Sequence, residues 1–266
     1  MAQTTKAPPK PCILGIVTAD MLAARQYPPS LWECGGVELR ADGLNPDLVA
    51  GAVSDFDNEK GRRGFTGPVI FTLRLRRDGG AWPDDAAAER NAIWESLPPG
   101  TCDWVDLEVD AITQVDEVTL DTLRSSGVKV LLSHHAFTPE DSSLWETRLD
   151  TMRAFHPDGV KFAVTASTAQ IPLLLEFARK VGAEFSDACV LGMGAEGSVT
   201  RLVSPLLGCA LTYGFIGDGA VAPGQLPVKA MQDFFARAAR ADSGVPAADA
   251  PVAHWLEWAA ARMEGP

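Results

Sequence analysis

The chain has 266 residues, of which 46% are hydrophobic and 22% are charged, so it is long enough for one large α/β barrel or two modest domains. The formal net charge is −12 and no basic run is longer than the stretch 74–77, which excludes a typical nucleic-acid-binding protein. Five scattered cysteines without a CxxC pair argue against a disulfide framework and against a zinc site. The first residues lack the apolar core of a signal peptide and no segment reaches membrane-spanning length, so we expect a cytoplasmic protein with no membrane contact.

After a disordered lead over residues 1–10, short apolar runs alternate with helical patterns as far as residue 241. We expect strands at Ile13–Val17, Gly36–Arg40, Val69–Arg74, Trp104–Val109, Val128–Ser133, Val160–Val164, Cys189–Leu191 and Cys209–Tyr213. Candidate helices lie at Leu44–Ser54, Asp84–Glu95, Asp116–Ser126, Ser142–Phe155, Ile171–Val181, Ser198–Leu207 and Val228–Ala241.

Eight strands that recur with helices between them predict parallel βαβ units closed into a (β/α)8 TIM barrel over residues 11–241. A doubly wound open sheet is the alternative, but no GxGxxG follows the first strand. Residues 242–266 form a C-terminal extension with a predicted helix at Val252–Met263, which packs on the barrel or on a partner subunit.

Lys161 lies inside the predicted buried strand Val160–Val164. A buried ammonium is costly, so such a lysine is paired, reaches solvent from the strand end, or is held partly neutral. A partly neutral lysine can attack a carbonyl carbon and form a Schiff base.

Other charged residues also fall near the ends of predicted strands, where a barrel places its active site. Because side chains alternate along a strand, Glu38 and Arg40 share one face, Asp106 and Glu108 share another, and Ser133 and His135 project opposite to His134. Arg74 ends the third strand, and loops after the seventh and eighth contain Arg201 and Gln225. So many charges at one mouth would require mutual pairing and a polar ligand.

With these residues in this order, the sequence resembles the type I 3-dehydroquinate dehydratases. The resemblance runs from about Ile13 to Gln225 and rests on an ordered set of motifs rather than on one of them. The matching elements are Glu38-x-Arg40-x-Asp42, Arg74 followed by Gly79-Gly80, Asp106-x-Glu108, Ser133-x-His135 with Thr138-Pro139, Val160-Lys161-x-Ala163, Met193 through Arg201, and Ala222 through Gln225.

Three residues depart from the family pattern. Ala136 replaces the acid that usually follows the histidine, Val221 replaces a lid serine that is thought to contact substrate, and Cys209 replaces a common serine. The first two departures concern rate and substrate fit, whereas Cys209 concerns packing.

The resemblance implies dehydration of 3-dehydroquinate to 3-dehydroshikimate by a hydro-lyase that needs neither metal nor organic cofactor. Lys161 would form the covalent imine, His135 would act as general acid and base, and Glu108 would orient His135. Arg201 and Gln225 would hold the substrate carboxylate, while Glu38, Arg40 and Arg74 would bind its hydroxyls. The resemblance also favours a homodimer.

Three alternatives remain open from the sequence. Another Schiff-base lyase such as an aldolase would explain Lys161 but not the other motifs. A non-catalytic metabolite-binding regulator, or a barrel with a shifted substrate, would account for Ala136 and Val221. The pattern does not separate a role in aromatic amino acid biosynthesis through the shikimate pathway from one in quinate catabolism.

Overall fold

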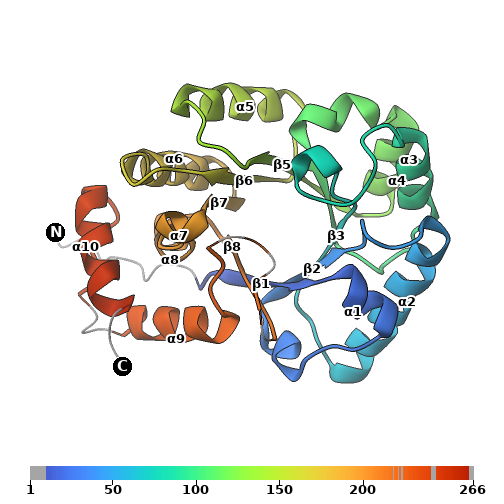
Figure 1. Ribbon diagram of the computed structural model, residues 1–266, viewed down its shortest axis with the longest axis horizontal. Coiled ribbons are helices and arrows are strands. Elements are labelled where there is room, and N and C mark those ends of the chain that lie inside the picture. The colour runs from blue at the N-terminus through green and yellow to red at the C-terminus, as the bar shows by residue number, and fades with distance from the viewer. Residues whose placement is uncertain (1–9, 218, 221, 223, 241–243, 264–266) are drawn as a thin grey trace.

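The computed structural model describes residues 10–217, 219–220, 222, 224–240 and 244–263, and it contains eight parallel strands surrounded by helices (Figure 1). The strands pair in the order β7-β6-β5-β4-β3-β2-β1-β8, so the last strand returns beside the first. This confirms the predicted (β/α)8 barrel in place of an open doubly wound sheet. The strands are β1 (Cys12–Val17), β2 (Gly36–Arg40), β3 (Val69–Thr72), β4 (Trp104–Glu108), β5 (Lys129–Ala136), β6 (Gly159–Thr165), β7 (Asp187–Met193) and β8 (Leu211–Gly214).

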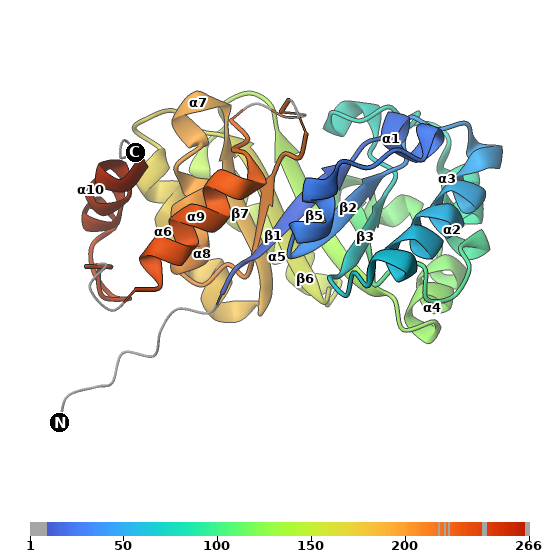
Figure 2. The same cartoon turned by 90° about the horizontal axis from the view of Figure 1, so that it is seen from below.

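The barrel helices lie outside the strands, as the side view shows (Figure 2). They are α2 (Pro46–Arg63), α3 (Ala87–Ser96), α4 (Glu117–Ser125), α5 (Ser142–Ala154), α6 (Ile171–Glu184), α8 (Thr200–Leu206) and α9 (Val228–Ala238). Helix α2 runs well past the predicted end at Ser54 and stops where Gly64 adopts a φ of 65°. The predictions for residues 1–9, for Val221 and for Ala241 fall outside the described residues.

Several short elements were not predicted from the sequence. They are the helices α1 (Ala19–Ala24) and α7 (Gly194–Gly197) and the 3₁₀ turns η1 (Pro29–Glu33), η2 (Arg76–Asp78) and η3 (Val109–Gln114). Each is too short for a helical period to show in the sequence, and α1 depends on the Thr18 side chain, which accepts a hydrogen bond from the Met21 amide.

Strand β4 shows how the sequence separates the inner and outer layers of the barrel. All five residues of β4 are buried. Val105 and Leu107 join the apolar layer between strands and helices, whereas Trp104 joins the barrel interior. Asp106 and Glu108 lie on the same inward face as Trp104, closer to the carboxyl end of the strand. The alternation therefore places apolar side chains at the bottom of the barrel and charged ones toward its mouth.

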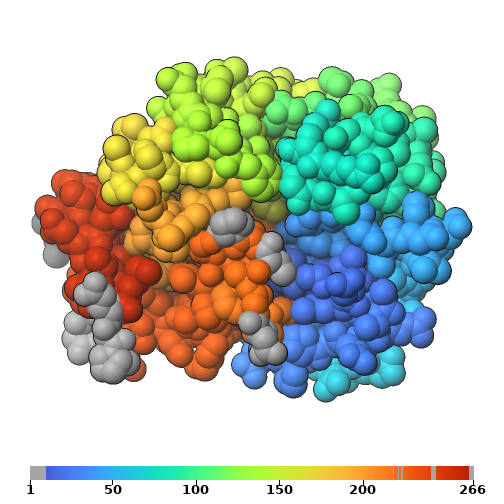
Figure 3. Space-filling model, in the orientation of Figure 1, coloured from blue at the N-terminus to red at the C-terminus, as the bar shows by residue number. Residues whose placement is uncertain are grey.

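The barrel closes at a seam between β7 and β8, for which the described residues show no ladder pairing. Helix α8 spans this seam. On the β7 side, Thr200 Oγ1 accepts from the Gly192 amide at 2.7 Å. On the β8 side, the Arg201 backbone oxygen accepts from the Thr212 hydroxyl at 2.9 Å, and Arg201 Nη1 donates to the Tyr213 carbonyl at 3.2 Å. On the other side of β8, the blue N-terminal part of the barrel adjoins the orange C-terminal part (Figure 3).

Helix α10 (Val252–Met263) packs on this chain's own barrel. It contacts α6 and α8, and Trp258 lies edge-on against Phe234 of α9, with ring centroids 5.5 Å apart. Arg179 of α6 also donates to the Ala250 carbonyl at 2.7 Å, which ties down the segment before α10. The apolar face of α10 is therefore covered by the barrel, which settles the choice that the sequence left open. Among the described helices, none is long and apolar enough to cross a membrane.

Candidate active site

Lys161 lies in the interior of the barrel on β6 and is 5% exposed. Its Nζ lies 3.0 Å from Oδ2 of Asp106 and 3.2 Å from Oε2 of Glu38. The same nitrogen lies over the ring of Tyr213, 4.2 Å from the centroid. The sequence left three possibilities open for Lys161. The possibility that its side chain reaches solvent is wrong, because the ammonium is buried and paired with Asp106 and Glu38.

Arg74 is the second buried cation of the site. Its Nη2 donates to Oδ2 of Asp106 at 2.6 Å, and its Nη1 donates to Ser133 at 2.8 Å and to Oε1 of Glu108 at 3.0 Å. Burial disfavours the ionised form of Asp106, but the charges of Arg74 and Lys161 outweigh burial and hold its pKa well below the usual range. Asp106 is thus a permanent carboxylate between the two cations.

Glu108 is held from two sides within this network. Its Oε1 accepts from Arg74 and from the Leu75 amide, and its Oε2 accepts from Arg90 of α3. Arg90 is itself buried and stacks on Trp94, with its guanidinium 4.6 Å from the ring centroid. Glu108 was predicted to orient His135. In the structure, both of its carboxylate oxygens accept hydrogen bonds from Arg74, Arg90 and a backbone amide.

The two neighbouring histidines of β5 point to opposite sides of the barrel wall. His135 lines the same pocket as Lys161, whereas Nε2 of His134 lies 2.9 Å from Oε1 of Glu140 and its ring packs against Phe162. Burial, together with the charges of Arg74 and Lys161, lowers the pKa of His135 well below its ordinary value. His135 is therefore a neutral base at physiological pH.

Asp78 also lines the pocket, although the sequence analysis gave it no role. It lies in the turn after β3, where Gly80 approaches the chain so closely that a Cβ there would meet the Arg74 carbonyl at 2.0 Å. Burial, followed by the nearby charge of Glu108, raises the pKa of Asp78 to about 6. The sequence feature that could have indicated Asp78 is its position between Arg74 and the pair Gly79-Gly80.

Arg40, Arg201 and Gln225 complete the polar wall of the pocket. Arg40 makes a double contact with Asp42, at 2.8 and 3.1 Å. Arg201 Nε donates to the Gly224 carbonyl at 2.9 Å, and burial lowers the pKa of this guanidinium to about 10. Arg201 thus remains a cation at neutral pH and joins α8 to the loop that contains Gln225.

Four buried polar atoms in the pocket lining have no hydrogen-bond partner within the described part of the chain. They are Glu38 Oε1, Asp78 Oδ2, His135 Nδ1 and Tyr213 Oη. Glu38 Oε1 has only an ion pair with Arg74, at 3.8 Å, and Asp78 Oδ2 has one with Arg77, at 3.6 Å. Buried polar groups are normally satisfied, so donors and acceptors directed into one pocket indicate a ligand with several oxygen atoms.

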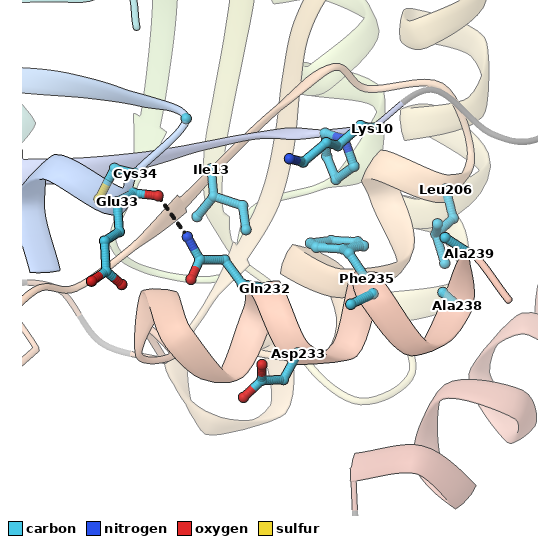
Figure 4. Close-up of a pocket in the computed structure, with 13 residues that line it drawn as sticks. Lys10, Ile13, Glu33, Cys34, Leu206, Gln232, Asp233, Phe235, Ala238 and Ala239 are labelled. Carbon is cyan, nitrogen blue, oxygen red and sulfur yellow. Dashed lines mark hydrogen bonds between the residues drawn. The ribbon is translucent and has the colours of Figure 1, made fainter. Parts of the chain in front are cut away.

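A larger cavity of about 520 Å³ lies at the opposite ends of the strands, between β1 and α9. Gln232 crosses it to donate to the Glu33 carbonyl at 2.7 Å, and Ile13 lies beside that contact, with Phe235 farther along α9 (Figure 4). None of its described lining residues has a buried polar atom without a partner. The smaller pocket of about 120 Å³ around Lys161 is therefore the better candidate for chemistry. Within the described ranges, no group of three or more His, Cys, Asp or Glu side chains is arranged to hold a metal ion.

The family model for type I 3-dehydroquinase matches residues 17–240 of this chain. The chain belongs to this family. A 3-dehydroquinate dehydratase of Coxiella burnetii is 31% identical over 207 residues, which cover 76% of this chain and 81% of that protein. One from Methanosarcina acetivorans is 32% identical over 204 residues, which cover 72% and 80%. The crystal structure of 3-dehydroquinate dehydratase from Geobacillus kaustophilus superposes with a TM-score of 0.69 at 25% identity, covering 86% of this chain and 91% of that one.

In this type I 3-dehydroquinase, every residue that the sequence analysis proposed for the site except Glu108 lines the pocket around Lys161. Glu108 lies behind the wall, in contact with Arg74. Asp106 belongs to a motif in the sequence but had no predicted function, and Tyr213 and Arg90 had no predicted role in the site. An inward position on a strand was available as a signal for Asp106 and Tyr213, but not for Arg90, because no sequence pattern shows that a helix α3 side chain reaches Glu108.

Proposed function

We propose that this type I 3-dehydroquinase dehydrates 3-dehydroquinate to 3-dehydroshikimate through a Schiff base on Lys161. The observation on which the proposal depends is the position of Lys161: a buried amine on a barrel strand, in one pocket with a neutral His135 and with unpartnered polar atoms. The carbonyl carbon of a ketone ligand in this pocket would lie within reach of the lysine nitrogen.

The first stage of the proposed reaction forms the iminium. The ammonium of Lys161 gives one proton to the neutral His135, and the resulting amine attacks the C3 ketone. A proton then moves from the attached nitrogen to the former carbonyl oxygen, which forms the carbinolamine. His135 returns its proton to the carbinolamine hydroxyl, which leaves as water and leaves a cationic carbon–nitrogen double bond. The carboxylates of Asp106 and Glu38, which contact Nζ in the free protein, stabilise that positive charge electrostatically.

The second stage eliminates water from the substrate. His135 removes the C2 proton, and the electron pair moves into the iminium to form an enamine. The enamine then expels the C1 hydroxyl, which takes the proton from His135 and leaves as water. Hydrolysis of the remaining iminium releases the enone product and restores the Lys161 amine. Every proton transfer and the electron sink are supplied by side chains and substrate, so we propose that no metal or organic cofactor is needed.

Substrate binding is proposed to follow the charge pattern of the pocket. Arg201 remains charged at neutral pH, so it is the proposed partner of the substrate carboxylate, with Gln225 beside it. Glu38 and Arg40 line the pocket and are proposed to bind ring hydroxyls. Arg74 is 1% exposed and contacts three carboxylates, so we propose that it mainly sets the charge of the site rather than binding a hydroxyl directly.

Asp78 is proposed to take the role that the sequence analysis gave to Glu108, as the acid that orients His135. Asp78 and His135 line one pocket and each has an unpartnered atom, whereas the oxygens of Glu108 are already engaged.

We propose that the protein acts in the cytoplasm, either in the shikimate route to aromatic compounds or in quinate breakdown. We also propose a homodimer, on family membership alone, since α10 covers its tryptophans against its own barrel. Light scattering of the purified protein tests the dimer.

The test of function mixes the full-length protein with 3-dehydroquinate and follows the ultraviolet absorbance of the conjugated enone product. A second aliquot is quenched with borohydride and examined by intact mass and peptide mapping. Turnover with an adduct on Lys161 is expected. An adduct without turnover would locate a defect after the iminium. The absence of both turnover and adduct, in a protein that circular dichroism shows to be folded, would overturn the proposal.

A further inference from the structure

The hydroxyl of Tyr213 is an unexplained buried donor within the pocket. Tyr213 lies on β8, is 3% exposed, and its Oη has no hydrogen-bond partner within the described residues. Burial, followed by the nearby charge of Glu38, raises the pKa of this phenol well above its ordinary value. The group is therefore a neutral hydroxyl that can donate, and leaving it unpaired in the interior is unfavourable by about 1–3 kcal/mol.

The position of the ring fixes what that hydroxyl can reach. Lys161 Nζ lies 4.2 Å from the ring centroid, and the Tyr213 backbone is held by Arg201, whose Nη1 donates to the Tyr213 carbonyl at 3.2 Å. Because Nζ lies over this ring, the hydroxyl at the edge of the ring belongs to the same pocket as the atoms that become bonded to Nζ. A ketone that Lys161 attacks presents its oxygen in that same region.

We propose that the Tyr213 hydroxyl donates a hydrogen bond to the oxygen of the carbonyl that Lys161 attacks, and then to the carbinolamine oxygen that forms from it. Tyr213 would thus be a further catalytic residue, active in imine formation. This inference rests on the proposed function for its substrate, but its chemistry requires only a ketone at Lys161. A donor at a developing oxyanion strengthens as the transition state forms, so it accelerates the step rather than only tightening binding.

The chain offers a matched control, because it contains only two tyrosines. The hydroxyl of Tyr27 is also buried and unpartnered, but its ring packs in an outer aromatic cluster with Trp32 and Phe56. Tyr213→Phe and Tyr27→Phe remove the same kind of orphan hydroxyl while keeping each ring. Only the first change affects the pocket, so any effect of removing a buried hydroxyl in general appears in both variants.

The experiment measures the single-turnover rate of the borohydride-trapped Lys161 adduct with 3-dehydroquinate, and the melting temperature, for wild type and both variants. Tyr213→Phe is expected to slow adduct formation about 10- to 100-fold with no loss of melting temperature. Tyr27→Phe is expected to leave the rate unchanged. An adduct rate within twofold of wild type in Tyr213→Phe, or equal slowing in both variants, would overturn the proposal.

A second ketone separates this inference from the proposed function. Cyclohexanone lacks the carboxylate and hydroxyls of the substrate but can still form an imine with Lys161. If wild type neither turns over 3-dehydroquinate nor forms an adduct with it, yet forms a cyclohexanone adduct that Tyr213→Phe slows, the function is wrong and the role of Tyr213 stands. If wild type turns over 3-dehydroquinate and Tyr213→Phe forms both ketone adducts as fast as wild type, the function stands and the role of Tyr213 is wrong. No adduct with either ketone in wild type would overturn both.

Discussion

Lys161 Nζ lies 3.0 Å from Asp106 Oδ2, and the same carboxylate oxygen accepts from Arg74 at 2.6 Å. One buried anion therefore holds two cations, one on β6 and one just past the end of β3. The Ser133 hydroxyl bonds the other oxygen of Asp106 at 2.5 Å. Because the pKa of Asp106 lies well below the neutral range, this carboxylate stays ionised and pairs with both cations of the active site.

Lys161→Ala should abolish turnover and the trapped adduct, because no other amine lies in the described pocket lining. It should also lower the free energy of unfolding by about 3–5 kcal/mol, since Glu38 and Asp106 keep their buried charge without this partner. Enone assays and urea denaturation measure the two effects. Retained turnover would contradict the Schiff-base proposal.

His135→Gln and His134→Gln form a matched pair on adjacent residues of β5. His135→Gln should reduce turnover by at least about 100-fold while the borohydride adduct still forms, because the general base is lost but the amine remains. His134→Gln should leave turnover within a few-fold of wild type, since its ring contacts Glu140 and Phe162 on the outer face. Similar losses in both variants would indicate a packing effect rather than catalysis.

Asp78→Asn should change how activity and stability depend on pH. The folded pKa of Asp78 is raised to about 6, so the folded state favours the protonated form. Its contribution to stability is present below its unfolded pKa of 3.8 and is lost as the pH rises through about 6. Replacing the acid by an amide should therefore stabilise the protein by roughly 1–3 kcal/mol at pH 8 and by much less at pH 4.

The same variant should also lose an acidic limb near pH 6 from the profile of kcat/KM, because the carboxylate that orients His135 is gone. Thermal unfolding at pH 4 and pH 8 and a kinetic pH profile measure these changes. A variant whose profile retains that limb would show that another group titrates there.

Glu108→Gln tests the original assignment of this residue against its observed contacts. The amide removes the negative charge that pairs with Arg74 and Arg90, so the free energy of unfolding should fall by about 3 kcal/mol. The pH dependence of kcat/KM should keep its shape, because the contacts of Glu108 are with these cations rather than with the base. Arg90→Met should give a comparable loss of stability. A shift of the pH profile in Glu108→Gln as large as in Asp78→Asn would favour the original assignment.

The sequence by itself determined the barrel and most of the residues around Lys161. Alternating apolar side chains mark strands, and inward positions near the carboxyl ends of β2, β4, β5 and β6 must converge once the barrel closes, so Glu38, Asp106, His135 and Lys161 could be grouped without coordinates. Family motifs then separated His135 from His134 and added Arg201 and Gln225.

Only the tertiary structure decided how those charges are paired. Arg90 reaches Glu108 from a helix, and Asp78 enters the pocket from a 3₁₀ turn. The alternation of side chains along a strand therefore predicts the position of neither residue. Hydrogen-bond partners depend on side-chain positions accurate to a fraction of an ångström, and strand periodicity gives only the face. For the same reason, the sequence could not show the contacts of Glu108 with Arg74 and Arg90, or the position of the Tyr213 ring next to Lys161.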